Sequence, residues 1–192
     1  LADVVNRLEV LAVTDPLTGA YNRRYIMNEI KRELSASIRH GLPVSVIMVD
    51  IDYYKSINDR HGHQVGDDVL REFVQVLSGC IRTSDVLGRY GGEEFIVLSP
   101  HTRLQEAIRL AERLRETVNK WPFETTYGFL KFTVSLGVTS FDGDDGDCAF
   151  KDNESLEDIL VDRLLAQADA EMYRAKAQGR NRVSPSLSEL ET

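Results

Sequence analysis

Apolar residues recur at three- and four-residue steps in five stretches of the chain, and this spacing predicts amphipathic helices. The stretches are residues 1–12, 22–41, 68–81, 104–118 and 156–177. Asn22 is suited to cap the second helix, which Gly41 and Pro43 end. The first stretch fits the end of a parallel coiled coil entering from an upstream domain, although two heptads do not establish one.

A different pattern, with runs of β-branched and aromatic residues, predicts the strands. Val44–Val49 is a continuous apolar run, as in a strand buried on both faces. Further strands are expected at 86–87, 95–98, 130–138 and around Val183. The polar stretch 53–66 and the Gly- and Asp-rich stretch 141–153 are predicted as loops. Helices and strands in this order predict an α/β fold, with helices over both faces of a mixed central sheet.

The composition is that of a soluble globular domain. Of 192 residues, 42% are hydrophobic and 28% are charged, and the length suits one domain with a full core. No apolar run is long enough to cross a bilayer and no signal peptide opens the chain. We therefore expect a cytoplasmic segment without direct membrane contact, although its parent can be membrane-anchored. Because the chain begins at Leu1, we expect it to be part of a longer protein.

Charge and cysteine content exclude some classes of protein. The 23 basic and 31 acidic residues give a net charge of −8, which argues against a nucleic-acid partner. Cys80 and Cys148 are the only two cysteines. We therefore expect no disulfide framework, and we expect the protein to be in a reducing compartment. Cys80 falls on the apolar side of a helical pattern, where core packing explains it.

The stretch with the most unusual chemistry is Gly91-Gly92-Glu93-Glu94, which lies between two predicted strands. Paired glycines there predict a tight hairpin turn. Without side chains, Gly91 and Gly92 leave room for a bulky anionic ligand, and a neighbouring carboxylate can hold a cation against it. The alternative is a plain turn with solvated acids.

Asp50 ends the central strand, where open α/β sheets place ligands, so it can meet Glu93 across the sheet edge. Two carboxylates and a carbonyl suit Mg²⁺, and no His/Cys cluster suggests zinc.

Several spaced motifs together resemble the GGDEF family of diguanylate cyclases. They are Asp50-x-Asp52-x-x-Lys55-x-x-Asn58-Asp59-x-x-Gly62-His63-x-x-Gly66-Asp67, Gly91-Gly92-Glu93-Glu94-Phe95, Asp15-x-Leu17-Thr18-Gly19, Asn22-Arg23-Arg24, Ser135-x-Gly137-Val138 and Ala175-Lys176-x-x-Gly179-Arg180-Asn181. The resemblance implies a palm-like fold shared with nucleotide cyclases and polymerases, with a mixed five-stranded sheet flanked by helices. It also implies condensation of two GTP molecules into cyclic di-GMP with release of two pyrophosphates. Residues 14–183 would form the catalytic domain, after a signalling helix stub at 1–13 and before a polar tail at 184–192.

The resemblance implies roles for the acids and for one lysine. Asp50, the carbonyl of Ile51 and Glu93 would bind Mg²⁺, with Mn²⁺ as a possible substitute. Glu93 would also deprotonate the attacking 3′-hydroxyl, and Lys55 would stabilise charge on the phosphates. Asp52 supports the loop or acts as a structural cap.

Other positions would bind the substrate GTP. Asn58 and Asp67 match the residues that read guanine, and His63 is associated with the substrate. From sequence alone Asp67 fits equally well as an N-cap of a helix beginning near residue 68, Asn58 as a turn residue and His63 as a loop hydrogen-bonder. Lys176 and Arg180 would clamp the β- and γ-phosphates, whereas two cations at a helix end otherwise only complement its dipole.

Arg82-Thr83-Ser84-Asp85 matches the site at which the family's product inhibits the enzyme, and Arg113 would assist. Taken alone, Arg-x-x-Asp is also a common surface pair.

The sequence departs from the family in having Tyr54 in place of phenylalanine, whereas glutamate at position 93 is a frequent active variant. The stretch 142–147 lacks the spacing of an EF-hand and is interpreted as a solvated insertion.

Two GTP molecules must face each other for this reaction, so a two-fold homodimer is expected. An upstream sensory domain would act through the first helix.

Two alternative functions stay open. A binding module would hold GTP or cyclic di-GMP without efficient turnover, but such relatives usually lose hairpin acids or glycines. A cyclase that also accepts ATP is disfavoured by Asp67, because adenine lacks the matching donors.

Overall fold

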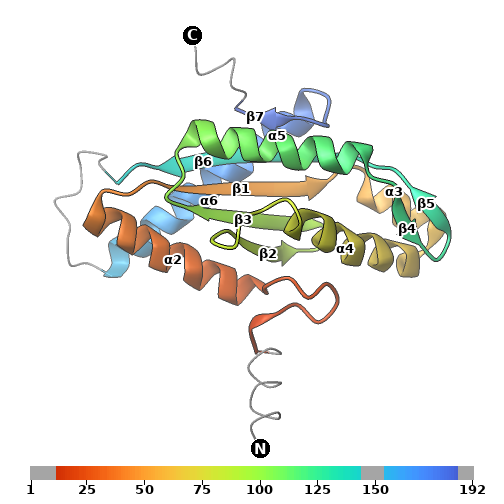
Figure 1. Cartoon of the computed structure of the whole chain (residues 1–192), viewed down its shortest axis with the longest axis horizontal. Helices are drawn as coiled ribbons and strands as arrows, with labels where there is room; N and C mark the ends of the chain where they lie inside the picture. Colours follow the sequence, from red (N-terminus) through yellow and green to blue (C-terminus); the bar gives the residue numbers. More distant parts are fainter. Residues whose placement is uncertain (1–11, 144–153, 186–192) are drawn as a thin grey trace, which may run out of the picture.

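A computed structural model describes residues 12–143 and 154–185 of the protein. Its main sheet has five strands in the order β2-β3-β1-β6-β7, all antiparallel to their neighbours except the parallel pair β6-β7 (Figure 1). The strands are β1 (Val44–Ile51), β2 (Val86–Gly91), β3 (Glu94–Pro100), β6 (Val134–Phe141) and β7 (Val183–Ser184). This confirms the predicted α/β class and the mixed five-stranded sheet.

Helices cover both faces of the sheet, and a small hairpin extends one end of it (Figure 1). The helices are α2 (Arg23–His40), α3 (Tyr54–His61), α4 (His63–Ser78), α5 (Leu104–Lys120) and α6 (Glu154–Ala177). The hairpin consists of β4 (Phe123–Thr125) and β5 (Gly128–Leu130). Figure 1 shows α3, the start of α4 and this hairpin gathered where the arrow of β1 ends.

The central strand β1 is buried along its whole length, as its apolar run predicts. Its side chains alternate between two separate cores. Ile47 and Val49 belong to the core that also includes residues of α4 and α5, whereas Val46 and Met48 belong to the core with residues of α2 and α6. Because the period of a strand is two, Asp50 follows the even-numbered side, toward α6.

The predicted ends of α2 are confirmed. The Asn22 side chain accepts a hydrogen bond from the backbone N–H of Tyr25, and Gly41 takes a left-handed conformation with φ of 65°. Each device satisfies backbone groups that a helix end leaves unpaired.

Helix α6 lies unusually close to β6, at Gly137. A Cβ atom on this glycine would lie 2.0 Å from the carbonyl oxygen of Ala168 and 2.3 Å from the backbone nitrogen of Met172. No other residue type fits there, since both neighbours are backbone atoms. Lys176 lies one helical turn beyond Met172, so this contact sets the position of Lys176 relative to the sheet.

The loop predicted at 53–66 is wrong, because α3 occupies residues 54–61 and α4 already begins at His63. Gly62, with φ of 86°, separates the two helices. Asp67 is therefore inside α4 and does not cap it. Residues 54–61 are polar and bury only Tyr54, so no apolar period indicates this helix, and packing against the rest of the domain stabilises it. The other end of α4 is also earlier than predicted, because the helix ends at Ser78 and Cys80 and Ile81 pack from beyond it.

The single strand predicted at 130–138 is divided. Leu130 ends β5 and Val134 begins β6, and the latter runs on to Phe141. Between them, the backbone oxygen of Thr133 accepts a hydrogen bond from the N–H of Asp52. The predicted helix at 1–12 and the loop at 141–153 fall mainly outside the described residues. Within the part of the chain that the structure describes, no helix is both long and apolar enough to span a bilayer.

Candidate active site at the carboxyl end of β1

The end of β1 and the turn of the β2-β3 hairpin adjoin, because β1 and β3 are neighbours in the sheet. Asp50 lies opposite Glu94 in the β1-β3 register, and Glu93 is next to Glu94 on the turn. Asp50 is 5% exposed, whereas Glu93 and Glu94 are partly exposed. Acids separated by more than forty residues in sequence are thus brought to one end of the sheet.

The positive charge near Asp50 does not fully offset the burial of its carboxylate and the repulsion from neighbouring acids. The pKa of Asp50 is raised to about 6, mainly by burial, because burial together with the nearby charges of Glu93 and Glu94 outweighs the lowering effect of Lys176. The Lys176 ammonium lies 2.8 Å from Asp50 Oδ2. An additional cation near Asp50 and Glu93 would therefore favour their ionised forms. No group of three or more His, Cys, Asp or Glu side chains within residues 12–143 and 154–185 is arranged to hold a metal. The predicted ligand set of two carboxylates and the backbone oxygen of Ile51 does not depend on such a group.

Arg89 fixes the backbone of the hairpin turn. Its Nε and Nη2 atoms donate hydrogen bonds of 3.0 and 2.8 Å to the carbonyl oxygen of Gly92, which has φ of 46°. Its Nη1 atom lies 3.0 Å from Asp15 Oδ1. Sequence reasoning gave Arg89 no role, because nothing in its spacing shows that its side chain turns back onto the hairpin.

The other end of this link is the turn at residues 15–18. Burial would raise the pKa of Asp15, but hydrogen bonds from Thr18 and Arg89 outweigh burial and lower it. After this turn, the backbone N–H of Tyr21 donates to the carbonyl of Leu87 and its carbonyl accepts from the N–H of Arg89, so Tyr21 forms an isolated bridge to the edge of β2. The segment that leads into the domain is therefore hydrogen-bonded to the strand that enters the Gly-Gly-Glu-Glu turn.

A second part of the site lies between α3 and α4. Asn58 Oδ1 is buried without a hydrogen-bond partner, and leaving such an acceptor unpaired costs about 1–3 kcal/mol. A Cβ atom on Gly66 would lie 2.0 Å from this oxygen and 2.8 Å from the Tyr54 hydroxyl. Burial raises the pKa of Tyr54, while a hydrogen bond with Asn58 lowers it and nearby Asp67 raises it. Asn58 and Asp67, which the sequence proposed as one unit, thus both lie beside Tyr54, and Gly66 provides the space for Asn58.

Asp52 connects the end of β1 to the segment that follows α6. It accepts hydrogen bonds from Thr133 Oγ1 (2.6 Å), Ser135 Oγ (2.7 Å) and the backbone N–H of Asn181 (3.0 Å). No side chain caps the N-terminus of α3, so of the two open interpretations the contacts favour support of the neighbouring loops. Its position also keeps Arg180 close to the end of β1.

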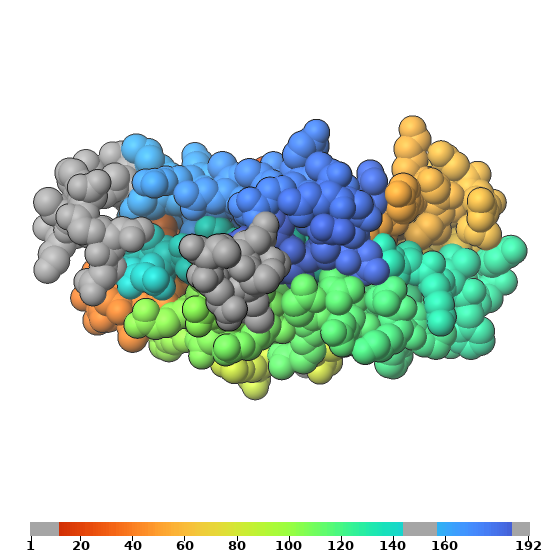
Figure 2. Space-filling view, turned by 90° about the horizontal axis from the view of Figure 1, so that it is seen from above, coloured from red at the N-terminus to blue at the C-terminus, as the bar shows by residue number. Residues whose placement is uncertain are grey.

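The remaining predicted site residues differ in exposure. Lys55 in the first turn of α3 and His63 at the start of α4 are exposed, whereas the side chain of Ile51 is buried and leaves only its backbone for the site. The Arg180 guanidinium carbon lies 4.5 Å from the centre of the Tyr53 ring. Figure 2 shows the orange surface of α3 beside the blue surface of the C-terminal segment, at the end of the molecule where the teal β4-β5 hairpin lies.

Comparison with known proteins agrees with this arrangement. The family model described as "Diguanylate cyclase, GGDEF domain" matches residues 12–182. The chain belongs to this family. Among its relatives, the response regulator PleD of Caulobacter vibrioides is 43% identical over 175 residues, which are 90% of this chain and 36% of PleD. Diguanylate cyclase DosC of Escherichia coli is 36% identical over 184 residues, which are 95% of this chain and 36% of DosC.

Solved structures show the same fold. The coiled coil and GGDEF domain of DgcB from Caulobacter crescentus, in complex with c-di-GMP, superposes with a TM-score of 0.81 at 25% identity. The match covers 95% of this chain and 90% of the DgcB chain. Our chain therefore corresponds to a GGDEF domain, and it spans 36% of the length of PleD and of DosC.

This GGDEF domain has a second cluster of charged residues away from the end of β1. Arg82, Asp85 and Arg113 line one pocket of about 250 Å³, together with Ser99, Thr102, Glu106, Arg109 and Leu110. The backbone N–H of Arg82 donates to Asp85 Oδ2 (2.9 Å), and Arg113 Nη2 donates to the carbonyl oxygen of Cys80 (2.7 Å). The three residues proposed from sequence thus share a pocket, although they lie on two different elements.

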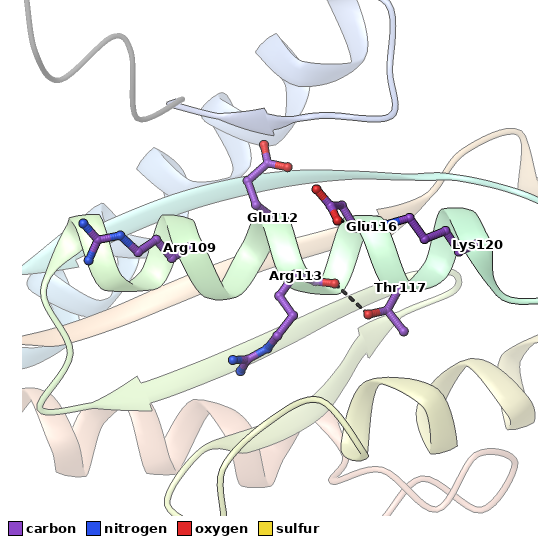
Figure 3. A pocket seen from close by; sticks show the side chains of 6 residues that line it. All are labelled: Arg109, Glu112, Arg113, Glu116, Thr117 and Lys120. Atoms are coloured by element: carbon purple, nitrogen blue, oxygen red, sulfur yellow. Dashed lines mark hydrogen bonds and ion pairs between the residues drawn. The ribbon is translucent and has the colours of Figure 1, made fainter.

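Arg109 also lines this pocket, and sequence reasoning did not single it out. It lies one turn before Arg113 on α5, so the spacing of the two arginines is the signal that was available. The adjoining surface of α5 lines a hollow of about 370 Å³. Figure 3 shows the side chains that line it, with Arg113 pointing away from Glu112. Glu112 and Glu116 alternate there with Arg109 and Lys120, so this second hollow carries both signs of charge.

Proposed function

We propose that this domain is an active diguanylate cyclase, which condenses two GTP molecules into cyclic di-GMP and releases two pyrophosphates. The observation that carries the proposal is the buried carboxylate of Asp50 opposite the Gly-Gly-Glu-Glu turn. Lys176 lies at the same end of the sheet and supplies a cation there. The buried, unpaired oxygen of Asn58 marks a place for a hydrogen-bond donor of the substrate.

Mg²⁺ fits this site, and Mn²⁺ is a chemically similar substitute. Asp50, Glu93 and the carbonyl of Ile51 would hold it, because a buried carboxylate with a raised pKa beside a second acid is a favourable place for a divalent cation. When bound, the ion would neutralise charge on the phosphate oxygens.

The residues of the chain would then divide the work. Glu93 would accept the proton of the attacking 3′-hydroxyl, while Lys55, Lys176 and Arg180 would balance the charge of the triphosphate. Asp67 would accept hydrogen bonds from the N1–H and the exocyclic amine of guanine, and Asn58 would accept from the amine's second hydrogen. Adenine offers no such pair of donors, so GTP is preferred to ATP. His63 would contact the substrate beside this pocket, and Gly91 and Gly92 would leave room for the nucleotide.

The reaction also implies partners. Each GTP must meet the 3′-hydroxyl of another, so two copies of the domain would face each other in a homodimer. An upstream sensory domain would set how the copies face, and the backbone hydrogen bonds between Tyr21 and β2 support such a route to the hairpin. Cyclic di-GMP would bind Arg82, Asp85 and Arg113 and inhibit turnover. The DgcB structure in complex with c-di-GMP supports binding of the product by such domains.

The deciding experiment incubates the domain with GTP or ATP and MgCl₂ and separates the nucleotide products by chromatography. We expect cyclic di-GMP from GTP and no cyclic dinucleotide from ATP. The activity per protomer should rise as dimers form. Glu93→Ala should lower turnover by at least about 100-fold, because it removes a proton acceptor and a metal ligand together. Glu124→Ala, an exposed acid on β4, is the matched control and should not change it.

Turnover that persists in a folded Glu93→Ala protein would contradict the assigned roles. GTP binding without any product at all protein concentrations would instead make the domain a nucleotide-binding module. Calorimetry of GTP binding, run beside the assay, separates these two outcomes.

A further inference from the structure

Tyr53 has an exposed ring that contacts one of the proposed phosphate-binding residues. The ring is 64% exposed, and the guanidinium carbon of Arg180 lies 4.5 Å from its centre. The Nη1 atom of Arg180 lies 3.4 Å from the Tyr53 hydroxyl oxygen. A cation over an aromatic face is held by the negative charge density of that face.

The backbones of both residues are fixed from the same point. Asp52 precedes Tyr53, and its Oδ2 atom accepts the backbone N–H of Asn181, which follows Arg180. Tyr53 and Arg180 both have left-handed backbone conformations, with φ of 59° and 63°. Non-glycine residues rarely adopt this conformation, and it persists only where the surroundings enforce it. The two side chains are therefore brought together by a constrained backbone.

The stack leaves the guanidinium able to bind an anion. Stacking uses the face of the guanidinium, whereas its N–H donors lie along the edge. In residues 12–143 and 154–185, no carboxylate forms an ion pair with Arg180. Lys176, in contrast, is 2.8 Å from Asp50 Oδ2 and has to share or leave that carboxylate to bind a phosphate.

We propose that Tyr53 is a positioning residue, whose ring holds the Arg180 guanidinium with its N–H edge toward the terminal phosphates of bound GTP. The inference rests on the proposed function, because it needs GTP at the end of β1. It adds a residue to which neither the motifs nor the resemblance assigned a role. The ring lowers the cost of ordering a long side chain when the triphosphate binds.

A double-mutant cycle tests this role. The variants are Tyr53→Ala, Arg180→Ala and the pair, with Tyr53→Phe as the conservative variant. Calorimetry measures two probes in MgCl₂: a GTP analogue with a methylene bridge between the α- and β-phosphorus atoms, and GMP. The analogue cannot release pyrophosphate, so binding is measured without turnover.

We expect Tyr53→Ala to weaken binding of the triphosphate analogue about 2- to 5-fold and to leave the affinity for GMP unchanged. This range corresponds to the energy of an exposed cation–π contact. Tyr53→Phe should bind both probes like the wild type. In the Arg180→Ala background, Tyr53→Ala should have no further effect. Tyr127→Ala, which removes another aromatic side chain that is 65% exposed, is the control and should match the wild type.

Additive effects in the cycle, equal weakening of GMP, or tighter binding by Tyr53→Ala would each overturn the inference. In the last case the ring would hold Arg180 away from the phosphates. A wild-type domain that binds neither probe would overturn the proposed function together with this inference, whereas additive effects in a domain that binds the analogue would overturn the inference alone.

Discussion

The two charged regions of this GGDEF domain are built in different ways. The site at the end of β1 combines side chains of β1, the hairpin, α3, α4 and the end of α6, and its central acid Asp50 is buried and paired with Lys176. The cluster of Arg82, Asp85 and Arg113 needs only one four-residue turn and one face of α5. Both of its arginines are exposed.

This difference decides how each region responds to change. In the first region the central charge of Asp50 is desolvated, and its pairing with Lys176 depends on the close packing of α6 against β6, so a distant backbone contact can displace it. Charges in the second region are solvated and screened, so each side chain acts largely by itself. The first region should therefore be disabled by steric changes far from any ligand, and the second only by removal of its own side chains.

The largest effect is expected from Gly137→Ala, which forces β6 and α6 apart. Its Cβ atom would lie 2.0 Å from the Ala168 carbonyl oxygen, and backbone atoms cannot move aside singly. We expect the free energy of unfolding to fall by about 3 kcal/mol or more, measured by urea denaturation. Gly79→Ala is the matched control, since its nearest neighbour would be 3.5 Å away, and it should change stability by less than about 1 kcal/mol. Equal stability of the two variants would show that the α6-β6 contact yields easily.

A smaller steric change should disable the same region without unfolding the domain. In Gly66→Ala the new Cβ atom would lie 2.0 Å from Asn58 Oδ1, the end of a side chain that can rotate away. Alanine also favours a helix over glycine by about 1 kcal/mol, which offsets the small shift of the Tyr54 hydroxyl that would lie 2.8 Å from the new atom, so the free energy of unfolding should change by less than about 1 kcal/mol. GTP affinity should fall about 10-fold or more, because Asn58 then leaves the base.

Calorimetry of GTP binding beside thermal denaturation checks this result, with Gln64→Ala on the exposed side of α4 as the control. Unchanged GTP affinity in Gly66→Ala would remove Asn58 from the proposed recognition of guanine.

The most restricted effect is expected from Arg113→Ala in the exposed cluster. It should raise the concentration of cyclic di-GMP that inhibits turnover by about 10-fold, the value of one hydrogen bond to a charged group. Initial turnover of GTP, with product kept low, should stay within about 2-fold of the wild type. Lys120→Ala, on the same helix but outside this pocket, is the control. Inhibition that is unchanged in Arg113→Ala, or turnover that falls with it, would contradict the separation of the two regions.

Much of the fold was predictable from patterns within single elements. The buried run 44–49, the caps Asn22 and Gly41, and the Gly-Gly hairpin depend on local chemistry, and each is present as predicted. Helix α3 was missed because its residues are polar and only Tyr54 is buried. The β4-β5 hairpin was missed because strands of three residues are too short to show a period.

The candidate site shows the same division. Motif spacing pointed to Asp50, Glu93, Asn58 and Asp67. Strand order places Asp50 beside the hairpin that carries Glu93, whereas Asn58 and Asp67 lie on α3 and α4. The contacts of Arg89 with Asp15 and of Tyr53 with Arg180 were not predictable, because each joins residues more than seventy positions apart. Long-range contacts of this kind leave no periodic signal in the chain.

By itself, the sequence determined the class of the fold, the family and the set of residues that could bind a metal or substrate or transfer a proton. Periodicity, turn chemistry and motif spacing are properties of neighbouring positions, so they can be read from the sequence. Only the tertiary structure decided which charges are buried, which are paired and which stay free. Asp50 has a raised pKa and is paired with Lys176, while the Arg180 guanidinium lies over the ring of Tyr53. Desolvation and distance set these properties, and both exist only once the helices have packed on the sheet.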